Sequence, residues 1–127
     1  MYAYDPEHAP LPWEWLALDE QERILLAEEF HRRTGIKLPN LEAHAAFHAI
    51  VENQLAENLA SAVRAMARLT AEGLSRHEAV HAIGFVLAGH LNNLFKGKVG
   101  SGDPASLYDA ALDKLSARGW RKGGEGV

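Results

Sequence analysis

The sequence predicts an all-α fold, a compact bundle of four to five helices that follows an extended arm. Helix-start and helix-stop residues succeed one another along most of the chain. No segment alternates polar with β-branched or aromatic residues between turns, as a half-buried strand does. The 127 residues, of which 47% are hydrophobic and 24% charged, are typical of one globular domain, which we expect to span residues 1–127.

Residues 1–12 are the predicted arm. Pro6, Pro10 and Pro12 fix extended or turn geometry, and Tyr2 and Tyr4 indicate that the arm packs on the body of the protein. The N-terminal residues lack the basic and apolar regions of a signal peptide. No apolar stretch approaches the roughly 20 residues of a membrane helix. We therefore expect a soluble, cytoplasmic protein that has no membrane partner.

Capping residues mark the starts of the predicted helices. Asp19 with Glu22, and Ser75 with Glu78, have the spacing of capping boxes, and Asp103 precedes a proline at a helix start. The expected helices cover residues 20–33, 41–59, 61–72, 76–96 and 104–118, and the second and third are either continuous or broken near residue 58. Residues 97–102 are expected to form a flexible loop, and residues 121–127 a disordered tail.

Composition excludes several classes of function. The chain has no cysteine, so disulfide scaffolds, thiolate zinc fingers and cysteine catalysis are excluded, and a reducing cytosol fits. A net charge of −4 argues against a nucleic-acid partner. Association into a homo-oligomer is a partner class that the sequence leaves open.

Four of the seven histidines form two pairs at i,i+4 spacing. His44 and His48, followed by Glu52 after another four residues, lie on one stripe of their helix together with apolar residues. His77 and His81 border the apolar arc of a later helix. Because imidazoles on buried faces cost free energy unless their nitrogens are satisfied, these pairs need a structural or chemical reason.

The two pairs predict a divalent metal ion, zinc or iron, between two helices. An i,i+4 pair directs both rings at one ion, and neutral imidazole is a good ligand for these metals. Gly84 and Ala88, beside the second pair, leave room for a partner helix or a bound group, and Gln54 is a candidate outer partner. The candidate ligands are His44, His48, Glu52, His77 and His81.

The remaining histidines have no such pairing. His8 and His31 lack a helical partner and are expected to be ordinary surface or packing residues. His90 falls on the opposite side of its helix from His81.

Two alternatives use the same residues. In the first, the histidines and Glu52 form a buried polar network without metal, in a binding or structural module. In the second, HEAVH over residues 77–81 is the HExxH pattern of a metal-dependent hydrolase, with Glu78 as the general base. Glu78 already has a place in the predicted capping box, and no strand is predicted to hold a peptide substrate.

Four segments resemble a family of short bacterial helical proteins catalogued only as a domain of unknown function. These segments are WLALDEQER, HRRTGIKLPN, HAAFHAIVENQLA and RLTAEGLSRHEAVHAIGFVLAGHL, and the likeness covers about residues 13–91. Its most specific parts are HxxxHxxxExQ, from His44 to Gln54, and RHEAxHAIG, which contains His77, Glu78 and His81. Ser75 replaces an expected Asp, and Gly89 replaces an expected Glu. The resemblance implies a shared site and no particular reaction.

Overall fold

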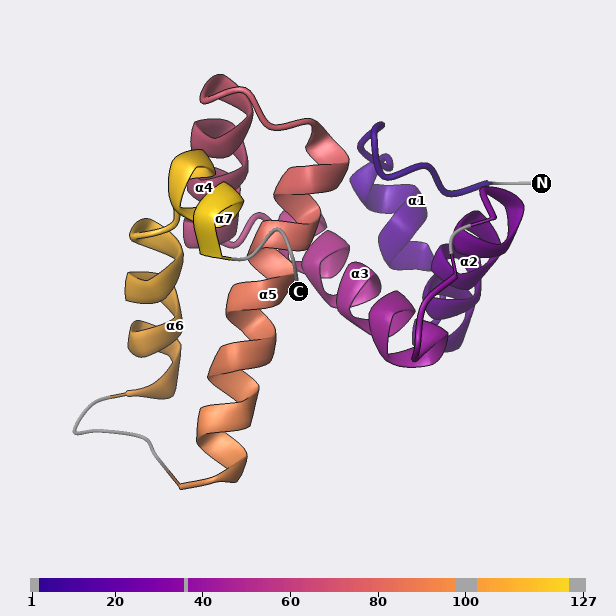
Figure 1. Ribbon diagram of the computed structural model, residues 1–127. Coiled ribbons are helices and arrows are strands. Elements are labelled where there is room, and N and C mark those ends of the chain that lie inside the picture. Colours follow the sequence, from indigo (N-terminus) through magenta and orange to yellow (C-terminus); the bar gives the residue numbers. More distant parts are fainter. Residues whose placement is uncertain (1–2, 36, 98–102, 124–127) are drawn as a thin grey trace.

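A computed structural model of the chain describes residues 3–35, 37–97 and 103–123 (Figure 1). These residues form seven helices and no strand, which confirms the all-α prediction. The helices are α1 (Pro12–Ala17), α2 (Glu20–Arg33), α3 (Leu41–Ala56), α4 (Ala60–Ala71), α5 (Arg76–Phe95), α6 (Pro104–Asp113) and α7 (Ala117–Gly123).

The capping residues start the helices as predicted. Asp19 and Ser75 form complete capping boxes at α2 and α5, so side chains satisfy backbone N–H groups that have no partner inside the helix. The second and third expected helices are not continuous, because the chain turns at Asn58. Its φ of 61° is left-handed, a conformation that asparagine tolerates better than most residues, and it separates α3 from α4.

Two short helices raise the number above the four to five that we expected. Pro12 occupies the first turn of α1, inside the end of the predicted arm. The last predicted helix is divided after Asp113, and Ser116 starts α7 by accepting the N–H of Gly119 at 3.0 Å. At the division, the guanidinium of Arg68 donates to the carbonyls of Leu112 at 2.7 Å and Leu115 at 3.0 Å. Of the predicted tail, residues 121–123 belong to α7 and residues 124–127 lie outside the described residues, as do residues 98–102 of the predicted loop.

Two hydrophobic clusters stabilise the fold. The N-terminal cluster joins the arm, α1, α2 and α3 and consists of Tyr4, Trp15, Ala27, Ala45 and Ala49. The C-terminal cluster joins α3 to the later helices and consists of Val51, Ala62, Ala65, Leu69, Leu74, Ala79, Val80, Ala82, Ile83, Leu87, Tyr108, Leu112 and Ala117. Figure 1 shows α1 and α2 on one side of α3, and α4 to α7 on the other. Helix α3 therefore contributes to both clusters.

The arm, residues 3–11, packs on the body, as predicted for Tyr4. Tyr4 is only 1% exposed, and its backbone carbonyl accepts a hydrogen bond from the guanidinium of Arg33 at 3.1 Å. The carbonyl of Pro6 accepts another from Arg76 at 2.9 Å. Glu7 accepts the backbone N–H of His77 at 3.0 Å. These contacts hold the arm across α2 and the start of α5.

None of the helices in the described part of the chain combines the length and the apolar character that crossing a bilayer requires.

Candidate metal centre

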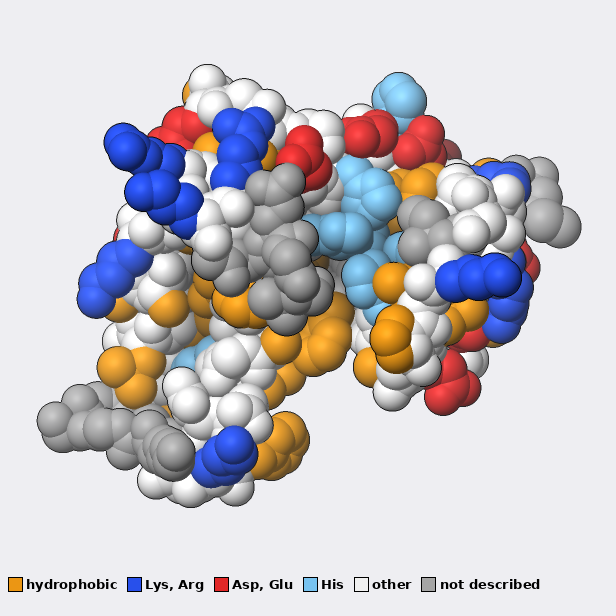
Figure 2. Space-filling view, viewed as in Figure 1, with side chains coloured by type: hydrophobic (Ala, Val, Ile, Leu, Met, Phe, Trp, Pro, Cys, Tyr) orange, Lys and Arg blue, Asp and Glu red, His pale blue; other side chains and the backbone are white. Residues whose placement is uncertain are grey.

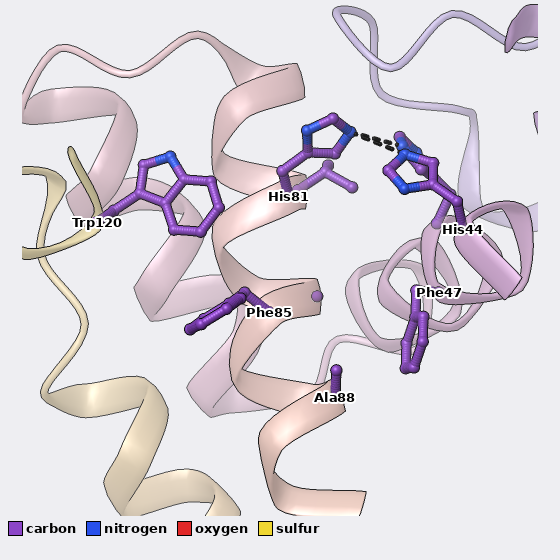
Figure 3. A pocket seen from close by; sticks show the side chains of 9 residues that line it. His44, Phe47, His81, Phe85, Ala88 and Trp120 are labelled. Carbon is purple, nitrogen blue, oxygen red and sulfur yellow. Dashed lines mark hydrogen bonds between the residues drawn. The ribbon is translucent and has the colours of Figure 1, made fainter. Parts of the chain in front are cut away.

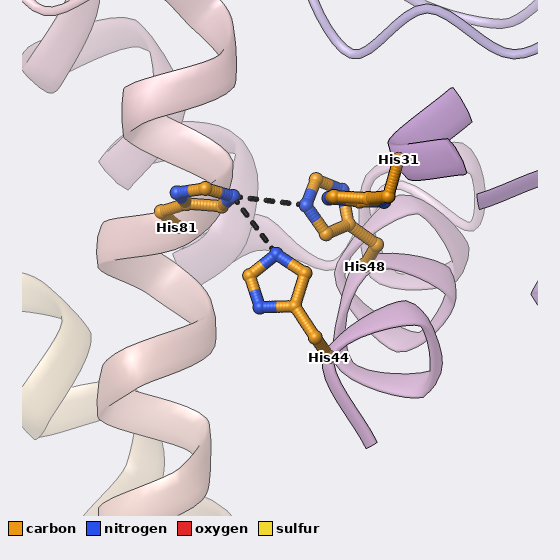
Figure 4. A group of neighbouring side chains, drawn as sticks. All are labelled: His31, His44, His48 and His81. Carbon is orange, nitrogen blue, oxygen red and sulfur yellow. Dashed lines mark hydrogen bonds between the residues drawn. The ribbon is translucent and has the colours of Figure 1, made fainter. Parts of the chain in front are cut away.

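Four histidine side chains meet between α2, α3 and α5 (Figure 4). Nε2 of His81 lies 3.2 Å from Nε2 of His44 and 3.0 Å from Nε2 of His48. One ring nitrogen of His31 completes a set of four, all within 4.8 Å of one another. Three of the four paired histidines, His44, His48 and His81, thus place ring nitrogens well inside the spacing of about 5 Å that one shared ion requires. The four histidines form a cluster that could hold a metal ion.

The packing of three helices brings these rings together. His44 and His48 are one turn apart on α3, so both project from the same side of that helix. His81 reaches them from the first half of α5, which packs against α3. His31 lies in the last turn of α2, which also packs against α3.

His48 is held by a chain of buried polar groups. The guanidinium of Arg76 donates to both carboxylate oxygens of Glu52, at 2.7 and 2.8 Å. The hydroxyl of Tyr4 donates to Glu52 at 2.5 Å, and its oxygen lies 3.1 Å from Nδ1 of His48. Because the single hydroxyl proton is given to the carboxylate, Nδ1 of His48 must be the donor to Tyr4. Nε2 of His48 therefore carries a lone pair that faces His81.

His31 has the same tautomer for a simpler reason. Its Nδ1 lies 2.6 Å from the carbonyl oxygen of Ala27, and a carbonyl can only accept, so Nδ1 carries the hydrogen. Its Nε2 is buried and has no hydrogen-bond partner among the described residues. A buried nitrogen without a partner costs free energy, and an ion at the centre of the cluster would remove that cost.

Burial keeps three of the rings uncharged. Burial lowers the pKa of His44 to about 4 and that of His81 to about 3, and repulsion from neighbouring histidines contributes to both shifts. The pKa of His48 is also well below its usual range, mainly because this ring is buried. At neutral pH all three are therefore in the form that binds metal.

His77 lies beside the set of four. Its ring centroid is 4.3 Å from that of His81, but its nitrogens do not join the group that lies within 4.8 Å. Its Nε2 is buried and has no hydrogen-bond partner among the described residues. His77 is thus a neighbour of the cluster and the nearest further histidine to it.

Glu52 and Gln54 have other partners. Glu52, which is 2% exposed, pairs with Arg76 and acts on the cluster only through the chain that ends at His48. The amide oxygen of Gln54 accepts the hydroxyl of Tyr108 at 2.7 Å. Neither side chain contributes an atom to the set of four nitrogens.

Glu78 closes the start of α5. Its carboxylate accepts the backbone N–H of Ser75 at 3.2 Å, and its own N–H donates to the hydroxyl of Ser75 at 3.1 Å. The capping prediction for Glu78 is confirmed. A hydrolase with Glu78 as general base would need this carboxylate beside the ion and a water molecule.

His31 is the member of the cluster that the analysis of the sequence missed, because it has no histidine partner in its own helix. A weaker signal exists. Ile24, Ala27 and His31 are spaced i, i+3 and i+7, so His31 continues the stripe of α2 that faces the core. Ile24 packs on the N-terminal cluster and Ala27 belongs to it.

Figure 2 shows where the site reaches the surface. Histidine side chains are visible in a hollow between the two halves of the molecule, and acidic side chains gather along one edge of it. Asp5, Glu7 and Glu78 lie close enough to His77 for their charges to act on it. These carboxylates favour a cation at this end of the cluster.

Comparisons with known protein families, with curated proteins and with solved structures find no match for this chain, and its resemblance to the bacterial family therefore stays a prediction.

Proposed function

We propose that the protein binds one divalent metal ion, zinc or iron, between α2, α3 and α5. The observation that carries this proposal is the convergence of four ring nitrogens, two of which have their lone pairs directed inward by hydrogen bonds on the opposite nitrogen. The proposed ligands are His31, His44, His48 and His81. The buried chain from Arg76 to Tyr4 is proposed to orient His48.

The spacing of the nitrogens suits a single ion. With metal–nitrogen bonds of about 2.1 Å, two ligands of a tetrahedral ion are separated by about 3.4 Å. The two Nε2 separations at His81, 3.0 and 3.2 Å, are within a few tenths of an ångström of that value. His31 lies within 4.8 Å of the others, so a small movement of its side chain brings it to the ion.

Without a cation the cluster is poorly satisfied. Nε2 of His48 carries a lone pair, so His81 can bond to it only by donating from its own Nε2. That single N–H then faces the lone pairs of His48 and His44, while Nε2 of His31 receives no hydrogen bond from the described residues. A proton cannot fill the gap at neutral pH, because burial lowers the pKa of His44 and His81.

A metal-free structural module is the second candidate, and one observation favours it. The chain through Arg76, Glu52 and Tyr4 is complete and holds His48 without any ion. In that case the same groups would act only to specify how the arm, α3 and α5 pack. The two candidates differ in whether added metal stabilises the protein.

Metal binding to protein purified without an affinity tag tests the proposal. Elemental analysis should find zinc or iron at about one ion per chain, and titration of the metal-free protein with Zn²⁺ or Fe²⁺ should saturate at the same ratio. Co²⁺ is a useful replacement because its absorption spectrum reports the ligands.

A pair of variants on α5 provides the matched control. His81→Ala removes a ligand, whereas His90→Ala removes a histidine of the same helix whose ring packs on Tyr108 instead. We expect the first variant to lose metal binding and the second to retain it. No uptake by the parent protein, or equal uptake by both variants, would leave the metal-free module as the function.

A further inference from the structure

A cavity of about 180 Å³ adjoins the histidine cluster (Figure 3). His44, His48 and His81 line one end of it. The other described residues that line it are apolar and come from α3, α5 and α7: Phe47, Val80, Gly84, Phe85, Ala88 and Trp120. His31 does not line the cavity, so an ion held by all four histidines would have His31 on its far side and the cavity on its near side.

From this arrangement we infer that the cavity binds a small, neutral, planar molecule that has one donor atom for the metal ion. The inference rests on the proposed metal site and extends it by naming the class of ligand. The donor atom would add a fifth ligand to the four histidines, an expansion that zinc sites can undergo, and the apolar body would lie between Phe47 and the side chains of α5.

Size and charge restrict the ligand. An apolar protein cavity of about 150 Å³ accommodates one benzene molecule, so this cavity accommodates one aromatic ring with a small addition. Among the described residues, no lysine, arginine, aspartate or glutamate lines it. A charged group on the body of the ligand would therefore find no charged partner among these side chains, which is unfavourable where the group leaves water.

Gly84 indicates that the space is not required by the packing of the helices. It lies inside α5, where glycine is less favourable than alanine. A Cβ atom at this position would meet Val51 at 3.8 Å and Phe47 at 3.9 Å, which are ordinary contacts. The fold would therefore accept alanine, and the effect of glycine is to leave the cavity larger.

Three probes of related shape test the inference on the Co²⁺-loaded protein at pH 7.5. Benzimidazole has both the ring and a donor nitrogen, imidazole has the donor without the additional ring, and indole has the shape without the donor lone pair. Burial of the additional ring predicts that benzimidazole binds at least about tenfold more tightly than imidazole. Indole should bind more weakly than benzimidazole and should leave the Co²⁺ spectrum unchanged.

Variants of α5 connect the result to the cavity. Gly84→Ala should keep Co²⁺ binding and thermal stability but lose most of the preference for benzimidazole over imidazole. Gly89→Ala is the matched control, because it makes the same change on the same helix where nothing lies within 4 Å. Ala88→Leu fills the cavity from the next turn and should act like Gly84→Ala.

The outcomes separate this inference from the proposed function. If Co²⁺ binds but benzimidazole and imidazole have equal affinity, or if Gly84→Ala and Gly89→Ala behave alike, the ligand inference is wrong and the metal site stands. If Co²⁺ does not bind, the proposed function fails and this inference fails with it.

Discussion

The two hydrophobic clusters differ in what they bury together with their apolar side chains. The N-terminal cluster packs beside a group of buried polar residues on α2 and α3, namely Glu28, His31, His48 and Glu52. Among the described residues, the C-terminal side buries only Ser61 in this way. Apolar packing thus dominates one region, and ordered polar chemistry is built into the other. Substitutions should therefore separate stability from metal binding.

The largest expected effect is the loss of the ion from the polar region. At a free metal concentration 1,000 times the Kd, binding adds about 4 kcal/mol to the free energy of unfolding. A chelator at pH 7.5 should remove this contribution and lower the melting temperature, and excess Zn²⁺ should restore it. His81→Ala should melt at the same temperature with and without chelator. Chelator sensitivity that survives in this variant would place the ion elsewhere.

In the C-terminal cluster, a substitution should lower the stability of the protein and leave its metal affinity unchanged. Leu69 is fully buried on α4, and Leu69→Ala should lower the free energy of unfolding by about 2–5 kcal/mol, because it removes apolar contacts and leaves a cavity. Denaturant unfolding of the metal-free protein measures this loss. The Kd for Zn²⁺ should be unchanged, and a large increase would show that the two regions are coupled.

Acid should destabilise the metal-free protein through the polar region. The pKa of His48 is lowered by folding, so below pH 6.5 the unfolded chain binds a proton that the folded chain does not. The contribution of neutral His48 to the free energy of unfolding is complete above pH 6.5. As the pH falls from 6.5 toward the pKa of the folded state, the free energy of unfolding drops by about 1.4 kcal/mol per pH unit for this buried ring. His44 and His81 act in the same direction, but less strongly because they are partly exposed.

Denaturant unfolding at pH 7.5, 6 and 5 measures this slope. His48→Gln should make the dependence shallower. A free energy of unfolding that is constant from pH 7.5 to 5 would contradict the proposed burial of neutral rings.

Two tyrosines allow the polar chain to be tested with a matched change. Tyr4→Phe removes the hydroxyl between Glu52 and His48, and loss of such an outer partner should weaken metal binding about 10- to 100-fold. Tyr108→Phe removes a hydroxyl that contacts Gln54, away from the histidines, and should leave the Kd unchanged. Equal metal affinity in both variants would show that the chain does not support the site.

The smallest expected effect concerns Glu78. Glu78→Gln retains a capping side chain and should change the free energy of unfolding by no more than about 1 kcal/mol, with no change in the Kd for Zn²⁺. A large loss of metal binding would reopen the assignment of Glu78 as a helix cap. Calorimetric titration and thermal melting distinguish these results.

Local signals in the sequence were enough to predict most of the helices. Asp19, Asn40 and Ser75 act on backbone groups only three residues away, so their roles are visible without the tertiary structure. The division between α6 and α7 has a local signal too, because Ser116 accepts the N–H of Gly119, three residues later, at the start of α7. The sequence does not show that the side chain of Arg68 binds the carbonyls of Leu112 and Leu115 at this division, from more than forty residues away.

The candidate site was predictable to a similar degree. The i,i+4 spacing placed His44 and His48 on one stripe, and His81 on a partner helix. It could not reveal that His31 enters from α2, because helix packing determines that contact. Nor could it show that Glu52 pairs with Arg76, 24 residues away. Because of this pairing, Glu52 supports the ligand His48 and is not a ligand itself.

The docking of the arm has a consequence for how the protein is made. Tyr4 and Pro6 leave the ribosome before the residues to which they bond, which lie 44 and 70 positions later in the chain. The arm can therefore dock only after the start of α5 has been synthesised, and closing such long loops is slow. During that interval the side of His48 that Tyr4 later covers is open to solvent. A bulky fusion that blocks docking would keep the protein in this early, incompletely assembled form.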